Sequence, residues 1–347
     1  CVYLMIRYFT KPPILKTEIT HGDSEEVFTF FPASPWQLEQ FKLAIIGCNE
    51  SCANDFRDQF YPLYWKWVNR FDIIDAGDFT AISNREKAKV VHDFIDAGVL
   101  PILIGASYDL LSEIQSVYSE MAFPFRTAVV NPDLRKVLSL IPENIFCRNL
   151  YILATQRQFG FHLIHEHDYF QVPLSEFRSK HNGVEPYTRS ADLCFMDLDA
   201  IRHSDHPAAI QCLPSGLSSE EACIMMKLAG NGDRLRSLMI SSWNSVEDRK
   251  KVSAKLIAQM VWYFVEGFSL ASYDDIYSNQ NMSEYIVDIK GSDSPLRFFK
   301  SETSGKWWIK EMKQDGTVKN RLFPCTYDEY LSCAQENIPD RLQQILY

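Results

Sequence analysis

The chain of 347 residues and 40.2 kDa is long enough for one large domain or two smaller ones, and 46% of its residues are hydrophobic. This composition excludes an intrinsically disordered chain, a collagen and a small disulfide scaffold. The 35 basic and 45 acidic residues give a formal charge of −10 without any block of lysine and arginine, which argues against nucleic acid as a partner.

Short apolar runs alternate with longer amphipathic runs from about residue 41 to residue 268. Continuous apolar runs predict buried strands, and apolar residues at helical spacing predict helices. The expected strands lie at 41–48, 71–77, 100–105, 126–131, 150–155, 191–199 and 237–243. The expected helices lie at 56–71, 85–98, 109–121, 218–230 and 246–267.

Strands that are apolar on both faces and alternate with helices predict an α/β fold with three layers, in which helices on both faces cover a mostly parallel sheet. We expect this main domain to span residues 41–280. Residues 1–40 are expected to be an N-terminal segment packed on it, and residues 281–347 a small C-terminal extension rich in β-structure.

The C-terminal extension combines strand patterns with one helix pattern. Trp307 and Trp308 are neighbours on one expected strand, so only one can point to a given surface, and core packing is expected for at least one of them. The pair Asp315-Gly316 predicts a hairpin turn. Thr326 and Glu329 have the spacing of a capping box, which predicts the start of a helix.

The nine cysteines are scattered and mostly lie inside apolar runs, as expected for reduced thiols in a cytosolic core. Cys48 and Cys52 are the only close pair, and no second pair completes a zinc site. The first residues lack the basic segment and cleavage site of a signal peptide, and the apolar stretch 256–271 is too short to cross a bilayer. We therefore expect a cytoplasmic protein without membrane contact.

Ligands of parallel α/β sheets bind outside the carboxyl ends of the strands. The segments that follow the expected strands therefore predict the position of a site. Those with polar side chains are 105–109, 131–135, 197–202 and 241–245.

The strand end FMDLDAIRHSDHPA (195–208), followed by PSGLSSEEA (214–222), resembles the ureohydrolase family of arginases, agmatinases and formimidoylglutamases. Three other strand ends resemble that family in the same order: PILIGASYDLL, TAVVNPDLR and SSWNSVEDRKK. The loop AIRHSDHP and the C-terminal SGKWW and PCTYDEY segments resemble a bacterial formimidoylglutamase-like branch. The resemblance implies an arginase-like fold for the main domain.

The resemblance also implies a chemistry, in which four aspartates and two histidines hold two Mn²⁺ ions and a bridging water attacks a guanidino or formimino carbon. Most of those positions differ in this chain. Tyr108 stands at one metal histidine, and the D-x-H-x-D positions are Asn131, Asp133 and Arg135. The glutamate that contacts the substrate in active relatives is replaced by Ser242.

Three carboxylates remain as weak candidate metal ligands: Asp133, Asp197 and Asp199. Arg135 adds a permanent positive charge, because its guanidinium group does not deprotonate and therefore cannot coordinate a metal. We therefore expect Arg135 to pair with Asp197 or Asp199 in place of the metal, and Arg202 could do the same. The alternative is that Asp197 and Asp199 only cap the neighbouring helix and loop.

The histidines in the sequence HLIHEH, which are His162, His165 and His167, are interpreted as loop residues rather than as a metal site. His203 and His206 lie close to Asp199 in the sequence and are candidates for a rearranged site.

These observations favour a non-catalytic homologue, a pseudoenzyme that needs no cofactor and binds a small charged ligand or a protein partner. The alternative is a C–N hydrolase of amidine or guanidine substrates with a reduced Mn²⁺ site. A homo-oligomer is compatible with both. The expected pocket residues are Tyr108, Asn131, Arg135, Arg202, His203, His206, Ser242 and Asn244.

Overall fold

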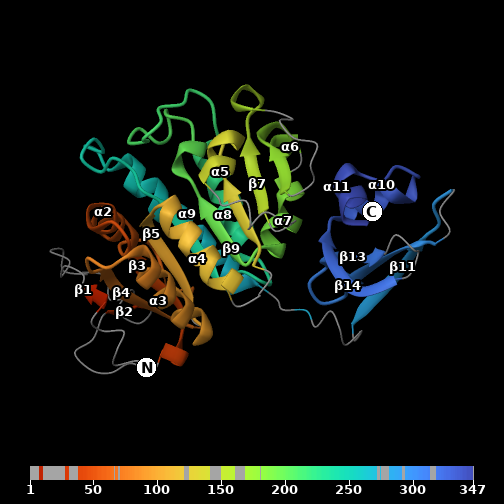
Figure 1. Cartoon of the computed structure of the whole chain (residues 1–347), viewed down its shortest axis with the longest axis horizontal. Coiled ribbons are helices and arrows are strands. Elements are labelled where there is room, and N and C mark those ends of the chain that lie inside the picture. Colours follow the sequence, from red (N-terminus) through yellow and green to blue (C-terminus); the bar gives the residue numbers. More distant parts are fainter. Residues whose placement is uncertain are drawn as a thin grey trace.

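The structure is a computed structural model that describes the following residues: 8–10, 28–30, 38–65, 67–68, 71–120, 125–140, 150–160, 169–179, 181–271, 274, 281–290, 294–312 and 318–346. Its largest element is a sheet with the strand order β1-β4-β3-β5-β10-β9-β6-β7-β8, in which β2 also pairs with β4 (Figure 1). All these pairs are parallel except β1 with β4. The strands are β1 Phe9–Thr10, β2 Phe28–Phe30, β3 Phe41–Gly47, β4 Asp72–Phe79, β5 Leu100–Ala106, β6 Thr127–Val130, β7 Leu150–Thr155, β8 Tyr169–Pro173, β9 Leu193–Met196 and β10 Ser237–Ser241.

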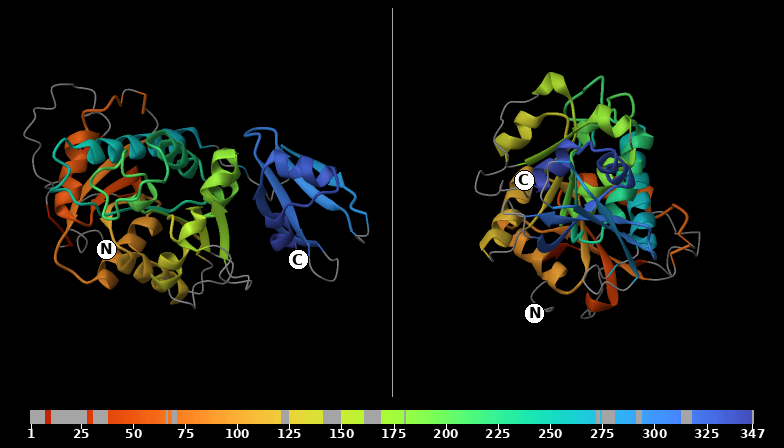
Figure 2. Two further views of the ribbon diagram at one scale, coloured as in Figure 1. Left: turned by 90° about the horizontal axis from the view of Figure 1, so that it is seen from above. Right: turned by 90° about the vertical axis from the view of Figure 1, so that its right-hand side faces the viewer.

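Helices cover both faces of this sheet, as Figure 2 shows from two sides. Two separate hydrophobic clusters fill the two gaps between layers, one beneath α2, α8 and α9 and the other beneath α3, α4 and α5. The helices of the main domain are α2 Glu50–Phe60, α3 Asn84–Asp96, α4 Tyr108–Glu120, α5 Leu134–Leu140, α6 Leu174–Ser179, α7 Glu185–Ser190, α8 Ser219–Gly230 and α9 Val252–Leu270, with 3-10 turns η2 Leu38–Gln40, η4 Arg157–Phe159, η5 His181–Val184 and η6 Leu198–Ala200.

Strand β3 shows why the sequence folds into three layers. Leu43 and Ile45 belong to the cluster beneath α2, α8 and α9, whereas Ala44 and Ile46 belong to the cluster on the opposite face. Side chains alternate between the faces of a strand, so a continuous apolar run supplies both layers at once. The predicted α/β class, with a mostly parallel sheet and helices on both faces, is confirmed.

Several predicted bounds are wrong. The helix expected at 56–71 is α2, which starts after its cap Asn49 and ends at Phe60, before Pro62, a residue without the N–H that continues a helix. The helix expected at 246–267 starts only after Lys251, which has a left-handed backbone conformation. The long strand expected at 191–199 stops early, because Asp197 caps the turn η6.

The C-terminal extension is a second, antiparallel sheet with the strand order β11-β12-β13-β14. Trp307 and Trp308 are both buried in it, at 8% and 2% exposure, which agrees with the expectation that at least one of them is core. The predicted capping box of Thr326 and Glu329 is present. The Asp315-Gly316 turn lies outside the described residues. The elements are β11 Met282–Val287, β12 Leu296–Ser301, β13 Trp307–Met312, β14 Val318–Cys325, α10 Tyr327–Ala334 and α11 Asp340–Leu346.

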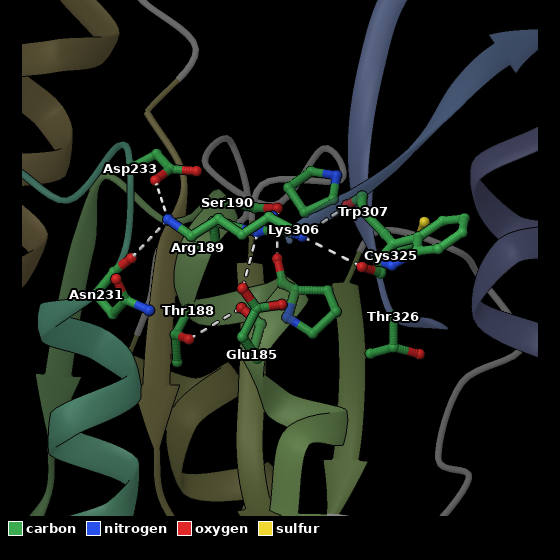
Figure 3. A network of polar contacts seen from close by, with 12 residues as sticks. Glu185, Thr188, Arg189, Ser190, Asn231, Asp233, Lys306, Trp307, Cys325 and Thr326 are labelled. Atoms are coloured by element: carbon green, nitrogen blue, oxygen red, sulfur yellow. Dashed lines mark hydrogen bonds and ion pairs between the residues drawn. The ribbon is translucent and has the colours of Figure 1, made fainter. Parts of the chain in front are cut away.

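Polar contacts join this extension to the main domain, and Figure 3 shows them from close by. The Arg189 side chain from α7 donates from one terminal nitrogen to the carbonyl oxygens of Trp307, at 2.8 Å, and Cys325, at 3.2 Å. Lys306 forms an ion pair with Asp233, which follows α8. The second sheet is therefore anchored at two separate places of the main domain.

Within the described part of the chain, no helix combines the length and the apolar character that crossing a bilayer requires.

Candidate functional site

The polar residues expected at strand ends meet at the carboxyl edge of β5, β10, β9 and β6, which are neighbours in the sheet. Tyr108 starts α4 after β5, Asn131 follows β6, and Asp197 follows β9. All three strands are parallel, so their carboxyl ends lie at one edge and bring these side chains together although they are far apart in the sequence.

Asp197 is the centre of this group and is buried. Its Oδ2 accepts hydrogen bonds from the Tyr108 hydroxyl at 2.8 Å and from the Asn131 amide at 2.6 Å. Its Oδ1 accepts one from the backbone N–H of Asp199 at 3.0 Å, which makes Asp197 the cap of η6. The capping part of the alternative interpretation is therefore correct for Asp197, although capping is not the only contact of its carboxylate.

Lys136 supplies the positive charge of the site. Its ammonium nitrogen lies 3.0 Å from Asp197 Oδ2 and 3.1 Å from Asp199 Oδ2, and its side chain is 25% exposed. Burial lowers the pKa of Lys136, but the two carboxylates outweigh burial and raise the pKa above the usual value. Lys136 therefore stays charged and forms a bridge between the two aspartates.

The pKa of Asp199 is raised by burial first and by the neighbouring charge of Asp197 second. The backbone N–H of Gln211, which donates to Asp199 Oδ1 at 2.9 Å, and Lys136 both oppose this rise. Burial and the same aspartates raise the pKa of the Tyr108 hydroxyl far above its usual value, so Tyr108 is a neutral hydrogen-bond donor.

Arg135 lies outside this network, so its expected pairing with Asp197 or Asp199 is wrong. Its side chain is 60% exposed, and its Nε donates to the carbonyl of Phe159 at 3.0 Å. The cause is the start of α5: Asp133 accepts the backbone N–H groups of Arg135 and Lys136, at 2.9 and 3.2 Å. Successive helical residues differ by about 100° around the axis, so residue 136 faces the aspartates while residue 135 faces solvent.

The Asp133 side chain caps the start of α5, because one of its oxygens accepts both of these backbone N–H groups. Arg202 pairs with Asp205 at 2.7 Å, so its expected pairing with Asp199 is also wrong. Ser242 donates from its hydroxyl to the Gly105 carbonyl at 3.0 Å, and Asn244 is exposed. Arg202, Ser242 and Asn244 lie at the same strand ends but make no described contact with Asp197.

His206 is fully buried, and neither ring nitrogen has a hydrogen-bond partner among the described residues. Burial, opposed by the charges of Asp248 and Asp197 and aided by the neighbouring His203, lowers the pKa of its imidazole to about 4. His206 is therefore neutral near pH 7. The other predicted histidines, His162, His165 and His167, lie outside the described residues.

A Mn²⁺ ion takes carboxylate oxygens and imidazole nitrogens as its protein ligands. No group of three or more His, Cys, Asp or Glu side chains within the described ranges has a geometry that could hold a metal. The two aspartates that the chain retains share a lysine ammonium, which carries a positive charge and has no lone pair to donate. The residues present do not fit the metal.

Lys136 was missed by the sequence interpretation. The expected replacement charges were Arg135 and Arg202, and Lys136 directly follows Arg135 in the sequence. The signal was present: a proline and an aspartate at 132–133 predict a helix start, and the third residue after a capping aspartate points back over the first turn.

Solved structures with a similar architecture include two enzymes that act on formimidoylglutamate by their names. A Trypanosoma cruzi formiminoglutamase solved with Mn²⁺ superposes with a TM-score of 0.58 at 19% identity, over 70% of this chain and 100% of that one. A formimidoylglutamase from Bacillus subtilis gives 0.58 at 11% identity, over 78% of this chain and 100% of that one.

This chain has the arginase-like fold. An agmatine ureohydrolase of Thermoplasma volcanium extends the similarity, with a TM-score of 0.53 at 13% identity over 67% of this chain and 91% of that one. A scan against protein-family models and a search of curated proteins gave no match. The predicted resemblance to ureohydrolases is thus confirmed at the level of the arginase-like fold.

Proposed function

We propose that this chain is a non-catalytic protein of the arginase-like fold, in which Lys136 takes the role that metal ions have in active relatives. The observation that carries the proposal is the pair of contacts from the Lys136 ammonium to Asp197 and Asp199, at 3.0 and 3.1 Å. A built-in cation compensates two buried carboxylates, which would otherwise be costly to bury.

The hydrogen bonds around Asp197 support the same proposal. Tyr108 and Asn131 both donate to Oδ2, the oxygen that Lys136 also contacts. A metal ion at this oxygen would have to displace donors that already satisfy it. An activated water, the nucleophile of the family's chemistry, requires such an ion, because nothing else described at this site lowers the pKa of water toward neutrality.

We infer that the retained role is binding of a small charged ligand or of a protein partner at the strand ends. Two cationic groups that reach solvent there are Arg135 and Arg202, with side chains 60% and 42% exposed. A carboxylate or another oxyanion suits such guanidinium groups best. The arginines stand outside the Lys136 bridge, so a ligand could contact them without breaking it.

Metal content tests the proposal. The protein is incubated with excess Mn²⁺, desalted and analysed by mass spectrometry, and hydrolysis of formimidoylglutamate, agmatine and arginine is assayed in the same sample. We expect far less than one ion per chain and no turnover. One or two ions per chain together with turnover would favour the alternative function, a C–N hydrolase with a rearranged metal site.

The variant Lys136→Ser tests the contribution of the lysine independently of the other residues of the site. It removes the ammonium and leaves Asp197 and Asp199 able to bind a cation, so we expect it to retain more Mn²⁺ than the wild type. The variant Lys251→Ser is the control, because Lys251 pairs with a single aspartate, Asp55, at 2.7 Å. Equal metal retention in both variants would contradict the assigned role of Lys136.

A further inference from the structure

Strand β11 is an edge of the second sheet, because the strand order β11-β12-β13-β14 gives it one neighbour, β12. In the described part of the chain, no strand pairs with its other side. The opposite edge, β14, is held by the main domain, since Arg189 from α7 donates to the Cys325 carbonyl at 3.2 Å. In Figure 1, β14 lies toward the main domain and β11 on the far side. An unprotected edge strand is a place where a further strand can be added.

The backbone groups on the free side of β11 can be assigned from one hydrogen bond. The N–H of Glu302, which follows β12, donates to the Asn281 carbonyl at 2.9 Å. The carbonyl of residue 281 and the N–H of residue 282 belong to one planar peptide group and point in opposite directions, so the Met282 N–H points away from β12. These directions alternate along a strand. The free side of β11 therefore carries the N–H and C=O groups of Met282, Glu284 and Ile286.

The side chains alternate as well, and they continue to do so beyond the last residue of β11. From residue 284 to residue 290, the odd residues pack against the hydrophobic cluster of the extension, and the even residues are exposed. The exposed residues are one apolar side chain, Ile286, two acidic ones, Glu284 and Asp288, and one basic one, Lys290. The free edge thus has an acidic residue near its start and a basic residue at its end.

We propose that β11 pairs antiparallel with β11 of a second copy of this chain, so that the two extensions share one continuous sheet. The free backbone groups lie on even residues, so even residues must stand opposite even residues. Among the possible registers, Glu284 meets Glu284, Ile286, Asp288 or Lys290 of the second copy. Only the last register brings opposite charges together, and two-fold symmetry forms that pair at both ends of the contact. It also places Val287 opposite Val287 of the second copy on the core side.

Both charged residues can form this pair and keep the contacts they already have. Arg297 contacts a single oxygen of Glu284, Oε1, at 2.8 Å in the described contacts. The Lys290 side chain is 88% exposed, and its ammonium lies 3.9 Å from Glu336, which is a long contact. A second copy fits better than an unrelated peptide because every β11 segment supplies both charges in complementary order. Assembly ends at two copies, since a two-fold contact uses the free edge of each copy and α7 holds the other edge of the sheet.

Sedimentation velocity of the full chain over a range of concentrations tests the pairing. We expect a reversible shift from the chain mass of 40.2 kDa to twice that mass as the concentration rises. The variant Ile286→Pro loses an N–H on the free side but none that points to β12, so it should stay monomeric where the wild type is dimeric. The control Ile286→Ala keeps that N–H and should change the dissociation constant of the dimer less than about threefold.

Charge reversal tests the register. Glu284→Lys and Lys290→Glu each bring like charges together at both ends of the paired strands, so each should raise the dissociation constant of the dimer about tenfold. The double variant exchanges the two charges and keeps the formal net charge of −10. It should return the dissociation constant to within about threefold of the wild-type value.

Three outcomes would overturn the proposal. The first is a wild type that stays monomeric at every concentration. The second is a dimer that Ile286→Pro leaves unchanged, because another surface would then form it. The third is a double charge variant that dimerises no better than the single variants. Circular dichroism verifies that each variant is folded, and the charge variants provide an independent test if the proline disturbs the extension.

Discussion

The guanidinium carbon of Arg189 lies 4.7 Å from the ring centre of Trp308, so a charged side chain of the main domain is stacked on a buried tryptophan of the C-terminal extension. Arg189 is 1% exposed and also forms an ion pair with Glu185 one helical turn earlier, at 2.9 Å. A cation that bonds two carbonyls, one carboxylate and one aromatic face can only be buried in this way when both parts of the chain are in place.

Replacement of this arginine is expected to loosen the extension. In Arg189→Met the Trp307 and Cys325 carbonyls lose their donor and Glu185 loses its counter-ion, so stability should fall by about 2–4 kcal/mol. Urea unfolding measures the loss, and limited proteolysis reports whether residues 281–347 become accessible first. Arg178→Met removes a half-exposed ion pair with Glu221 and should cost about 1 kcal/mol or less. Equal losses would contradict the anchoring role.

The bridge of Lys136 leads to a second prediction. Lys136→Met leaves Asp197 and Asp199 without their shared cation, and we expect a loss of about 3 kcal/mol, the lower end for a buried pair because Lys136 is one-quarter exposed. Chemical denaturation provides the measurement. Lys251→Met breaks the more exposed pair with Asp55 and should cost about 0.5–1 kcal/mol. A Lys136 variant as stable as the Lys251 variant would disprove the bridge.

Gly105 and Gly98 form a matched pair for a third prediction. Both have a left-handed backbone, with φ of +75° and +76°. A methyl group at residue 98 would meet no atom within 4 Å, whereas one at residue 105 would lie 2.7 Å from Asn49 Cβ. Gly98→Ala should therefore cost about 1 kcal/mol of backbone strain, and Gly105→Ala about 1–3 kcal/mol more. Thermal unfolding of both variants checks the difference, and identical melting temperatures would refute it.

His206 gives a prediction on pH. Its folded-state pKa of about 4 lies below the unfolded value near 6.5, so the unfolded chain binds the proton first as the pH falls. Stability should therefore decrease as the pH falls from about 6.5 to about 4, by roughly 3 kcal/mol from this group. In His206→Leu this part of the pH dependence should vanish. The control His92→Gln changes a histidine on the surface helix α3, paired with Asp96 at 3.2 Å. A pH profile of unfolding that is the same in wild type and His206→Leu would rule the effect out.

The layered α/β fold could be predicted from the sequence because it depends on the pattern of apolar residues along the chain. Strand runs such as Phe41–Gly47 are apolar on both faces, which only a sheet covered on both sides accommodates. The first and last residues of a helix or strand were harder to predict where a single residue decides them, as Pro62 does after α2. The short elements α5, α6, α7 and β8 carry too few residues for a periodic signal, so none of them was predicted.

The charge compensation at the site was predicted, but the residue was not. The sequence predicts a cation beside Asp197 and Asp199, and Arg135 and Arg202 were the two candidates for it. The choice of Lys136 depends on the phase of α5, which Asp133 sets by capping its first turn.

A cation attached by its own side chain differs from a bound ion in one thermodynamic respect. The stabilisation from a bound metal grows with its free concentration and vanishes on dilution or chelation. Lys136 is present once in every chain at unit stoichiometry, so its contribution to Asp197 and Asp199 is the same at any protein or metal concentration. The strand ends of this chain would keep their arrangement in a cell starved of manganese. A metal-dependent relative would lose, under the same condition, both its metal ion and the stabilisation that the ion gives to the carboxylates around it.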